Sequence, residues 1–181
     1  MRTRRGVDPE GNLLIADGFT AIYDRHARTL YRYCARRVGP DLAEDVVAQT
    51  FLIAYERRHT FAQDQPPLPW LFGIATNVLN RHRRDEVRGY RALARTGVDP
   101  VQESHATRAE ERTDAQRRSR KVARVLAKLP RRQRDVLLLF AVAELSYAEI
   151  AEALDLPVGT VQSALHRARI KMRKALEDED R

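Results

Sequence analysis

Six polar or cationic side chains near the C-terminus have the types and spacing of groups that read DNA. They are Thr160, Gln162, Ser163, His166, Arg167 and Arg169. Hydroxyl and amide side chains hydrogen-bond the edges of bases, and arginine binds guanine or phosphate oxygens in pairs. The chemistry that these residues offer is recognition by hydrogen bonding and charge.

Two short helices are predicted to position these side chains. In the second helix, apolar residues recur at alternating steps of three and four and predict one buried face; they are Val158, Val161, Leu165, Ala168 and Met172. The first helix begins with a capping box formed by Ser146 and Glu149. The pattern favours a helix-turn-helix whose second helix enters the major groove. The alternative is an ordinary helical hairpin with a solvated outer face.

The charge balance agrees with a polyanionic partner, although a positive balance also serves solubility. Lys and Arg number 33 against 25 acidic residues, which gives a net charge of +8. The one cysteine, Cys34, excludes an intrachain disulfide and a thiolate zinc cluster, and it lies on an apolar stripe where a small core residue is expected.

No motif of an enzyme is present in the sequence. It has no P-loop, no G-x-G-x-x-G, no G-x-S-x-G and no H-E-x-x-H, and its histidines are scattered. We therefore expect no catalysis, no cofactor and no metal. The N-terminus lacks the apolar stretch of a secretion signal, and the longest apolar run, 136–143, is too short to cross a bilayer. A cytoplasmic protein without membrane insertion is expected.

Helical periodicity dominates the chain and predicts an all-α fold. One helix is predicted over residues 19–38, ending at Gly39 and Pro40, and Asp41 is a candidate cap for the next. A proline-interrupted segment follows, and Pro69 is predicted to begin a third helix. Residues 96–116 are polar and mixed in charge, which indicates a flexible linker before the second helical unit.

Two surfaces of the first unit are candidates for binding. The third helix carries a polar stripe through Asn77, Asn80 or Arg81, Arg84 and Arg88, suited to bases and phosphates or else simply a solvated basic face. The second helix carries acidic residues, which phosphate would repel. Contact with another protein is their expected functional role, and ordinary carboxylates near a helix start are the alternative.

Five segments of the chain, in a specific order and spacing, resemble one family. They are FTAIYDRHARTLYRYCARRVG from Phe19, AEDVVAQTFLIAYE from Ala43, PWLFGIATNVLNRHRR from Pro69, LPRRQRDVLLL from Leu129 and LSYAEIAEALDLPVGTVQSALHRAR from Leu145. Together they resemble the extracytoplasmic function (ECF) subfamily of bacterial RNA polymerase sigma factors. The resemblance implies two small helical domains joined by a flexible linker. The implied organisation is an N-terminal extension (1–17), a sigma-two-like helical bundle (18–92), the linker (93–118), a sigma-four-like helix-turn-helix domain (119–176) and an acidic tail (177–181).

The resemblance also implies partners and residue roles. The partners would be promoter DNA and core RNA polymerase, through the clamp helices of its largest subunit and its flap, and the family often adds an anti-sigma factor. Contacts to the polymerase would come from Asp41, Glu44, Asp45, Gln49 and Phe51. The promoter −10 element would be bound and melted by His59, Phe61, Gln63, Asp64, Trp70, Asn77, Asn80, Arg81 and Arg84, and the −35 element by the six C-terminal residues named first. Trp70 is either a wedge against the duplex or, as we favour, a core anchor.

Four positions depart from the family pattern, and one rival function stays open. Asp155 and Glu144 stand where glycine is common, and Ala164 and Thr76 where a basic residue is common. These departures would alter phosphate contacts or promoter preference. The rival is a stand-alone, dimeric helix-turn-helix regulator that binds duplex DNA at half-sites one turn apart.

Overall fold

The computed structural model describes residues 16–62, 64–97 and 109–177, and within them the chain is all helical, as predicted. The elements are α1 (Ala16–Val38), α2 (Pro40–Glu56), the short 3₁₀ turn η1 (Arg58–Thr60), α3 (Pro67–Arg81), α4 (Arg83–Thr96), α5 (Ala109–Lys128), α6 (Arg131–Ala141), α7 (Tyr147–Leu154) and α8 (Val158–Glu177). We refer to α1–α4 as the N-terminal group and to α5–α8 as the C-terminal group.

The start of α2 follows from two residues that cannot continue a helix. Gly39 takes the left-handed φ of 87°, and Pro40 occupies the first turn, where its missing N–H costs no hydrogen bond. Gly39 itself is the N-cap, and no side chain caps this helix. The prediction that Asp41 caps it is therefore wrong: Asp41 lies one residue inside the first turn, where its charge still suits the helix dipole.

The predicted third helix is two helices. It begins at Pro67 rather than Pro69 and ends at Arg81; His82 has non-helical dihedrals, and α4 starts at Arg83. The N–H of His82 donates to Leu79 O at 2.9 Å, a tightened last turn that ends α3. The polar stripe is thus broken, because Asn77, Asn80 and Arg81 belong to α3 whereas Arg84 belongs to α4.

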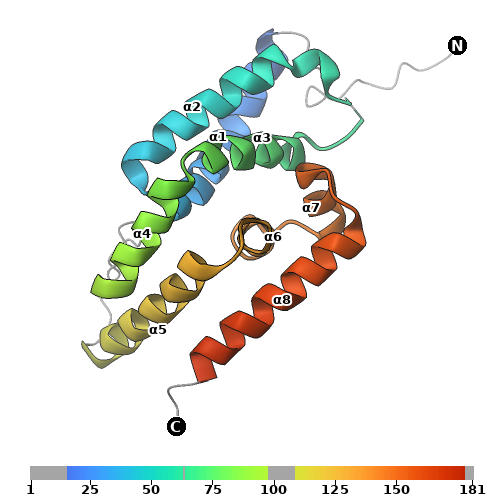
Figure 1. The fold of residues 1–181 in the computed structure, drawn as a ribbon. Coiled ribbons are helices and arrows are strands. Elements are labelled where there is room, and N and C mark those ends of the chain that lie inside the picture. Colours follow the sequence, from blue (N-terminus) through green and yellow to red (C-terminus); the bar gives the residue numbers. More distant parts are fainter. Residues whose placement is uncertain (1–15, 63, 98–108, 178–181) are drawn as a thin grey trace, which may run out of the picture.

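The two groups pack directly against each other. Figure 1 shows α6 end-on near the centre of the molecule, with α1–α3 above it, α4 to its left, and α5, α7 and α8 around it. Helix α3 packs on α7, helix α4 packs on α5, and the buried apolar side chains of both groups form one continuous cluster. Helices also extend into the predicted linker, 93–118, from both sides: α4 continues to Thr96 and α5 begins at Ala109. The predicted extension 1–17 and tail 177–181 lie almost wholly outside the described residues.

The contact between α3 and α7 is close because Gly73 has no side chain. A Cβ at Gly73 would lie 2.4 Å from the backbone oxygen of Ala153, well inside van der Waals distance. Glycine therefore lets the two backbones approach at this crossing.

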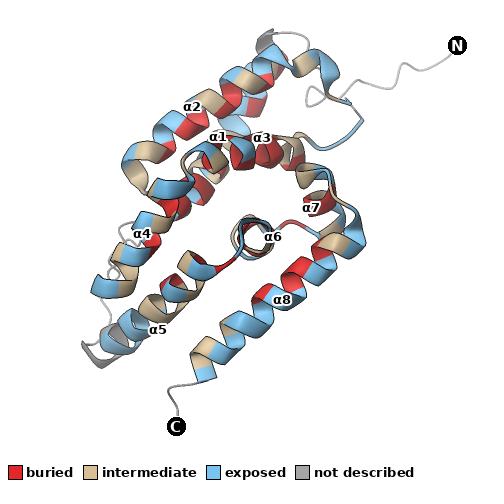
Figure 2. Cartoon of the chain, viewed as in Figure 1, coloured by how far each residue is buried: buried red, intermediate tan, exposed pale blue. Residues whose placement is uncertain are grey.

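Several large apolar side chains lie at the surface, among them Val158, which was predicted for the buried face of its helix. Leu52 is 58% exposed, Tyr55 and Val158 are 42% exposed, and Tyr23 is 46% exposed. The buried residues of α8 lie between Val161 and Ala168, and Figure 2 shows that the C-terminal part of the helix is largely exposed. Periodicity predicted the helices but overestimated how much of each apolar face the neighbours cover.

Cys34 is a core residue, as predicted, and its thiol should be unreactive in the folded protein. It is fully buried, and burial raises the pKa of its thiol to about 12. At about pH 8 only on the order of one molecule in ten thousand then carries the reactive thiolate.

We expect iodoacetamide to alkylate Cys34 in the native protein far more slowly than in the same chain in concentrated guanidinium chloride, because only the unfolded chain exposes the thiol. Equal rates in the two conditions, measured by mass spectrometry, would contradict this placement.

Candidate nucleic-acid interface

Helix α8 exposes a polar and cationic recognition face, which we define as Gln162, Ser163, His166, Arg167 and Arg169. All five are exposed, whereas Val161, Leu165 and Ala168 on the opposite side are buried. Thr160, predicted to belong to this face, is half-buried near the start of the helix. The Ser163 hydroxyl donates to Gly159 O at 2.8 Å, so this oxygen still has acceptor capacity toward a donor on DNA.

Packing against the rest of the C-terminal group restricts one residue of this face and buries another residue of α8. The guanidinium of Arg169 lies 4.5 Å from the centre of the Phe140 ring, which holds it against α6 by a cation–π contact. Ala164 is 1% exposed and belongs to the core. The expectation that Ala164 alters phosphate contacts is therefore wrong, because no side chain at this position would reach DNA without disrupting the packing.

Local geometry fixes the angle between α7 and α8. The Ser146 hydroxyl accepts from the Glu149 N–H at 3.3 Å, and the Glu149 carboxylate accepts from the Ser146 N–H at 2.8 Å, so the predicted capping box is present. Asp155 ends α7 in the left-handed conformation with a φ of 51°. The turn thus keeps its shape with aspartate, which tolerates this conformation better than most residues do.

The residues predicted for the −10 element do not all reach the surface. Asn77, Arg81 and Arg84 are exposed, on either side of the break between α3 and α4. The Asn80 side chain differs, since both its Oδ1 and Nδ2 atoms are buried and have no hydrogen-bond partner among the described residues. In this arrangement Asn80 is unavailable to DNA.

The loop between α2 and α3 presents polar groups beside an aromatic pair. His59 and Asp64 are exposed, and Gln63 lies outside the described residues. The Phe61 and Trp70 rings stack at a tilt with centres 4.9 Å apart, both half-buried against the hydrophobic core. Aromatic faces of this kind can stack on an unpaired base.

Helix α2 carries the acidic face, defined as Asp41, Glu44 and Asp45, which are all exposed. Gln49 is half-buried. Phe51 is 5% exposed and makes edge-to-face contacts with Tyr23 and Phe19, at centre distances of 4.7 and 6.1 Å. Phe51 therefore supports the helix from behind rather than lying on its surface.

Sequence reasoning missed the apolar residues of the same surface. Leu52 and Tyr55 are exposed and follow Asp41 and Asp45 at helical spacing, so they extend the acidic face along α2. The Arg58 guanidinium stacks 4.1 Å above the Tyr55 ring. The exposure of two large apolar side chains on one helix is typical of a protein-binding surface. Their helical spacing is visible in the sequence, but their exposure follows only from the structure.

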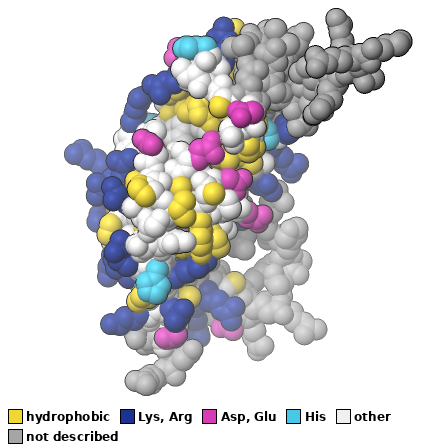
Figure 3. All heavy atoms as spheres, turned by 90° about the vertical axis from the view of Figure 1, so that its right-hand side faces the viewer, with side chains coloured by type: hydrophobic (Ala, Val, Ile, Leu, Met, Phe, Trp, Pro, Cys, Tyr) yellow, Lys and Arg dark blue, Asp and Glu magenta, His cyan; other side chains and the backbone are white. Residues whose placement is uncertain are grey.

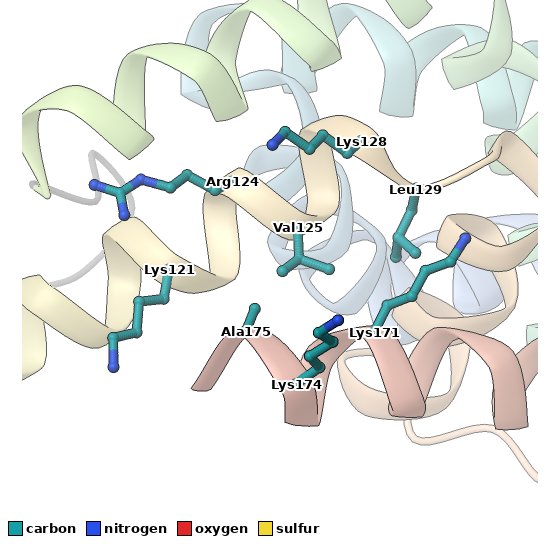
Figure 4. Close-up of a pocket in the computed structure, with 8 residues that line it drawn as sticks. All are labelled: Lys121, Arg124, Val125, Lys128, Leu129, Lys171, Lys174 and Ala175. Atoms are coloured by element: carbon teal, nitrogen blue, oxygen red, sulfur yellow. The ribbon is translucent and has the colours of Figure 1, made fainter. Parts of the chain in front are cut away.

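A basic groove lies between α5 and α8 and was also missed. It encloses about 640 Å³, and Figure 4 shows the side chains that line it, Lys121, Arg124, Lys128, Lys171 and Lys174 over a floor of Val125, Leu129 and Ala175. Lys121 Nζ donates to Leu176 O at 3.3 Å and Lys171 Nζ to Gln133 Oε1 at 3.0 Å. With no carboxylate among its lining residues, the groove is suited to phosphate.

The rest of the surface limits where nucleic acid fits. Figure 3 turns the right-hand side of Figure 1 toward the viewer: acidic and apolar side chains occupy the middle of this face, and Lys and Arg gather along its left and lower edges. In the described ranges no three metal-ligating side chains cluster, and no helix there is long and apolar enough to span a membrane.

A central ionic network, defined as Arg37, Glu86, Arg134 and Asp135, lies beneath these surfaces. Arg37 Nε donates to Glu86 Oε1 at 2.7 Å, its Nη2 to Asp135 Oδ1 at 2.6 Å and its Nη1 to the Tyr33 hydroxyl at 2.7 Å. Arg134 Nη2 lies 3.1 Å from Glu86 Oε2. All four residues are at most 3% exposed.

Arg37 keeps its charge despite burial. Burial lowers the pKa of Arg37, but Tyr33, Glu86 and Asp135 together raise it well above its usual value. Burial likewise raises the pKa of Tyr33 to about 12, so its hydroxyl stays protonated and is shared with Thr76 at 3.1 Å. Thr76 is 1% exposed, and the expectation that its substitution for a basic residue affects phosphate contacts is not met in this arrangement.

Comparison with known proteins identifies two regions, one within the N-terminal group and one within the C-terminal group. A family model described as Sigma-70 region 2 matches residues 22–89, and one described as Sigma-70, region 4 matches residues 119–172. The ECF RNA polymerase sigma factor SigW of Bacillus subtilis is 32% identical over 178 residues, covering 90% of each chain. The ECF RNA polymerase sigma factor SigL of Mycobacterium tuberculosis is 31% identical over 160 residues, covering 87% of this chain and 88% of SigL.

Solved structures share the fold. CnrH, in complex with the cytosolic domain of CnrY, superposes with a TM-score of 0.65 at 26% identity and covers 95% of this chain and 99% of its own. The sigma factor RpoE of Bartonella quintana, in complex with the anti-sigma factor NepR, gives a TM-score of 0.61 over 90% of this chain and 98% of its own; at 22% identity it supports the fold alone.

Proposed function

The chain belongs to the ECF RNA polymerase sigma factors, and we propose that it divides promoter recognition and polymerase docking among three of its surfaces. It is a transcription initiation factor that binds core RNA polymerase and directs it to promoters. The observation that carries the division of labour is the separation of charge: two basic surfaces lie on α3–α4 and α8, and an acidic one lies on α2.

In this proposal the C-terminal group, within residues 119–176, reads the −35 element as a duplex. The recognition face of α8 enters the major groove, where Gln162 and the arginine forks meet base edges. The basic groove beside it adds phosphate affinity that depends on salt but not on sequence. Thr160 contributes near the start of the helix.

The N-terminal group, within residues 18–92, handles the −10 element. Asn77, Arg81 and Arg84 bind the strand or its phosphates, and the loop with His59, Gln63 and Asp64 receives a base flipped out of the stack. The Phe61–Trp70 pair supplies an aromatic surface at the edge of this loop.

The acidic face of α2 docks on core polymerase, and Gln49 belongs to the same surface. Asp41, Glu44 and Asp45 supply charge complementarity, Leu52 and Tyr55 supply apolar contact, and Phe51 holds the helix from behind. A protein that binds the free sigma factor, as an anti-sigma factor does, is a further proposed partner, since CnrH was solved in complex with the cytosolic domain of CnrY. The chain acts in the cytoplasm, where polymerase and promoters meet, and catalyses no reaction of its own. The rival, a dimeric regulator acting alone, is not favoured, because the sigma-two region has no place in it.

Run-off transcription with purified core polymerase tests the function as a whole. Promoters that the polymerase occupies only in cells containing this protein would serve as templates. We expect transcripts that require both the protein and core enzyme. Tight, polymerase-independent binding of duplex promoter by a dimer, without any core-dependent transcript, would favour the rival function instead.

Asp45→Arg tests the docking surface. Reversing one exposed charge should reduce affinity for core polymerase on the order of tenfold or more. The free energy of unfolding should change by no more than about 0.5 kcal/mol, because the side chain is exposed. Asp114→Arg makes the same charge change on α5 and is the matched control. Identical core affinities of the two variants in a titration would refute the docking assignment.

Arg81→Ala combined with Arg84→Ala tests the surface on α3 and α4. Loss of two phosphate contacts should reduce promoter opening, measured by permanganate reactivity, on the order of tenfold while core binding stays unchanged. Arg117→Ala with Arg118→Ala removes two arginines from α5 and serves as control. A parallel fall in opening and core binding would show that the surface is structural.

A further inference from the structure

The N-terminal and C-terminal groups are joined by two ion pairs that each take one residue from either group. Arg37 of α1 binds Asp135 of α6, with 2.6 Å between Nη2 and Oδ1. Arg134 of α6 binds Glu86 of α4, with 3.1 Å between Nη2 and Oε2. Because all four side chains are buried, these pairs exist only while the two groups are packed together.

Buried ion pairs specify an arrangement more than they stabilise it. The cost of removing the charges from water offsets much of their attraction, but the loss of one partner leaves an uncompensated buried charge and is strongly unfavourable. An apolar contact alone tolerates sliding of one surface over the other. The central ionic network fixes one register between the two groups.

The packed arrangement also carries a cost at Asn80. Asn80 follows Gly73 by seven residues and so shares its face of α3, the face that packs on α7. Both polar atoms of the Asn80 amide are buried without a hydrogen-bond partner among the described residues, which is unfavourable for an amide.

Promoter geometry requires the two groups to separate. The −10 and −35 elements lie roughly 25 base pairs apart, or about 85 Å at about 3.4 Å per pair. In the packed arrangement α3 and α7 are in contact, with axes roughly 8–10 Å apart at such crossings. One chain therefore cannot occupy both elements while its groups are packed together.

We propose that the central ionic network is a lock that holds the free protein closed, with Asn80 hidden, and that the lock must release before both promoter elements are bound. The proposal rests on the assignment of the two groups to the two elements. The lock is a property of this chain by itself: polymerase or promoter DNA opens it only by binding the open form more tightly.

Asp135→Asn tests the lock with little change in side-chain shape. Without the Asp135 carboxylate, the two buried arginines of the network, Arg37 and Arg134, share Glu86 as their one acidic partner in the closed form. In the open form position 135 faces water. The ratio of open to closed molecules should rise on the order of a hundredfold. We expect small-angle X-ray scattering of the free variant to give a radius of gyration clearly above the wild-type value, with helix content by circular dichroism unchanged. Asp114→Asn, an exposed carboxylate that pairs on its own helix, is the control and should scatter as the wild type does.

Gly73→Ala opens the chain by a different route. A Cβ at Gly73 would lie 2.4 Å from the backbone oxygen of Ala153 in α7, so this methyl group would push the two groups apart without removing any network charge. It should expand the chain as Asp135→Asn does. Wild-type scattering from both variants would overturn the proposal, and so would a lower melting temperature of Asp135→Asn without expansion. These measurements contain neither polymerase nor DNA, so their failure is distinct from a failure of core-dependent transcription.

Discussion

Arg37 lies where α1, α4 and α6 meet, and the rest of the structure is arranged around its three acceptors. One guanidinium binds a carboxylate from each group and a tyrosine hydroxyl, and every donor that it directs at them is buried. A planar fork with several donors suits this role, whereas a lysine would offer a single point charge. Neither charge sign is in excess, because two arginines face two carboxylates. Because these charges compensate each other, the centre of a strongly basic protein can bury four charged side chains away from water.

The same balance explains how one small chain presents surfaces of opposite sign. The acidic face of α2 and the basic faces of α3, α4 and α8 belong to different helices, and the core beneath them is shared. Charges of one sign therefore gather on one partner-binding surface without repelling the other partner across the molecule. At physiological salt, screening over about 8 Å keeps these surfaces electrostatically separate.

Much of this architecture was predictable from local signals. The helices around Leu30, Val78 and Leu165 follow from periodicity, the capping box of Ser146 from its spacing to Glu149, and the boundary at Gly39–Pro40 from the conformations of those two residues. The break at His82 was not predictable, because no proline or glycine marks it. The burial of the Asn80, Thr76 and Ala164 side chains could also be established only from the structure. Each depends on which helix covers it, and tertiary contacts between residues far apart in sequence decide that. Arg37 and Asp135 show the limit most clearly, since two charged residues 98 positions apart gave no sign of being partners.

Gly73 has a consequence for how the protein would behave under genetic selection. A single methyl group at this position would meet the backbone of α7 and push the two groups apart, although it touches no residue assigned to DNA or polymerase. An allele that favours the open form of the free protein therefore needs only a conservative change at a site remote from every proposed binding surface. We expect such an allele to be dominant, because the open form is present whether or not the cell also makes the normal protein.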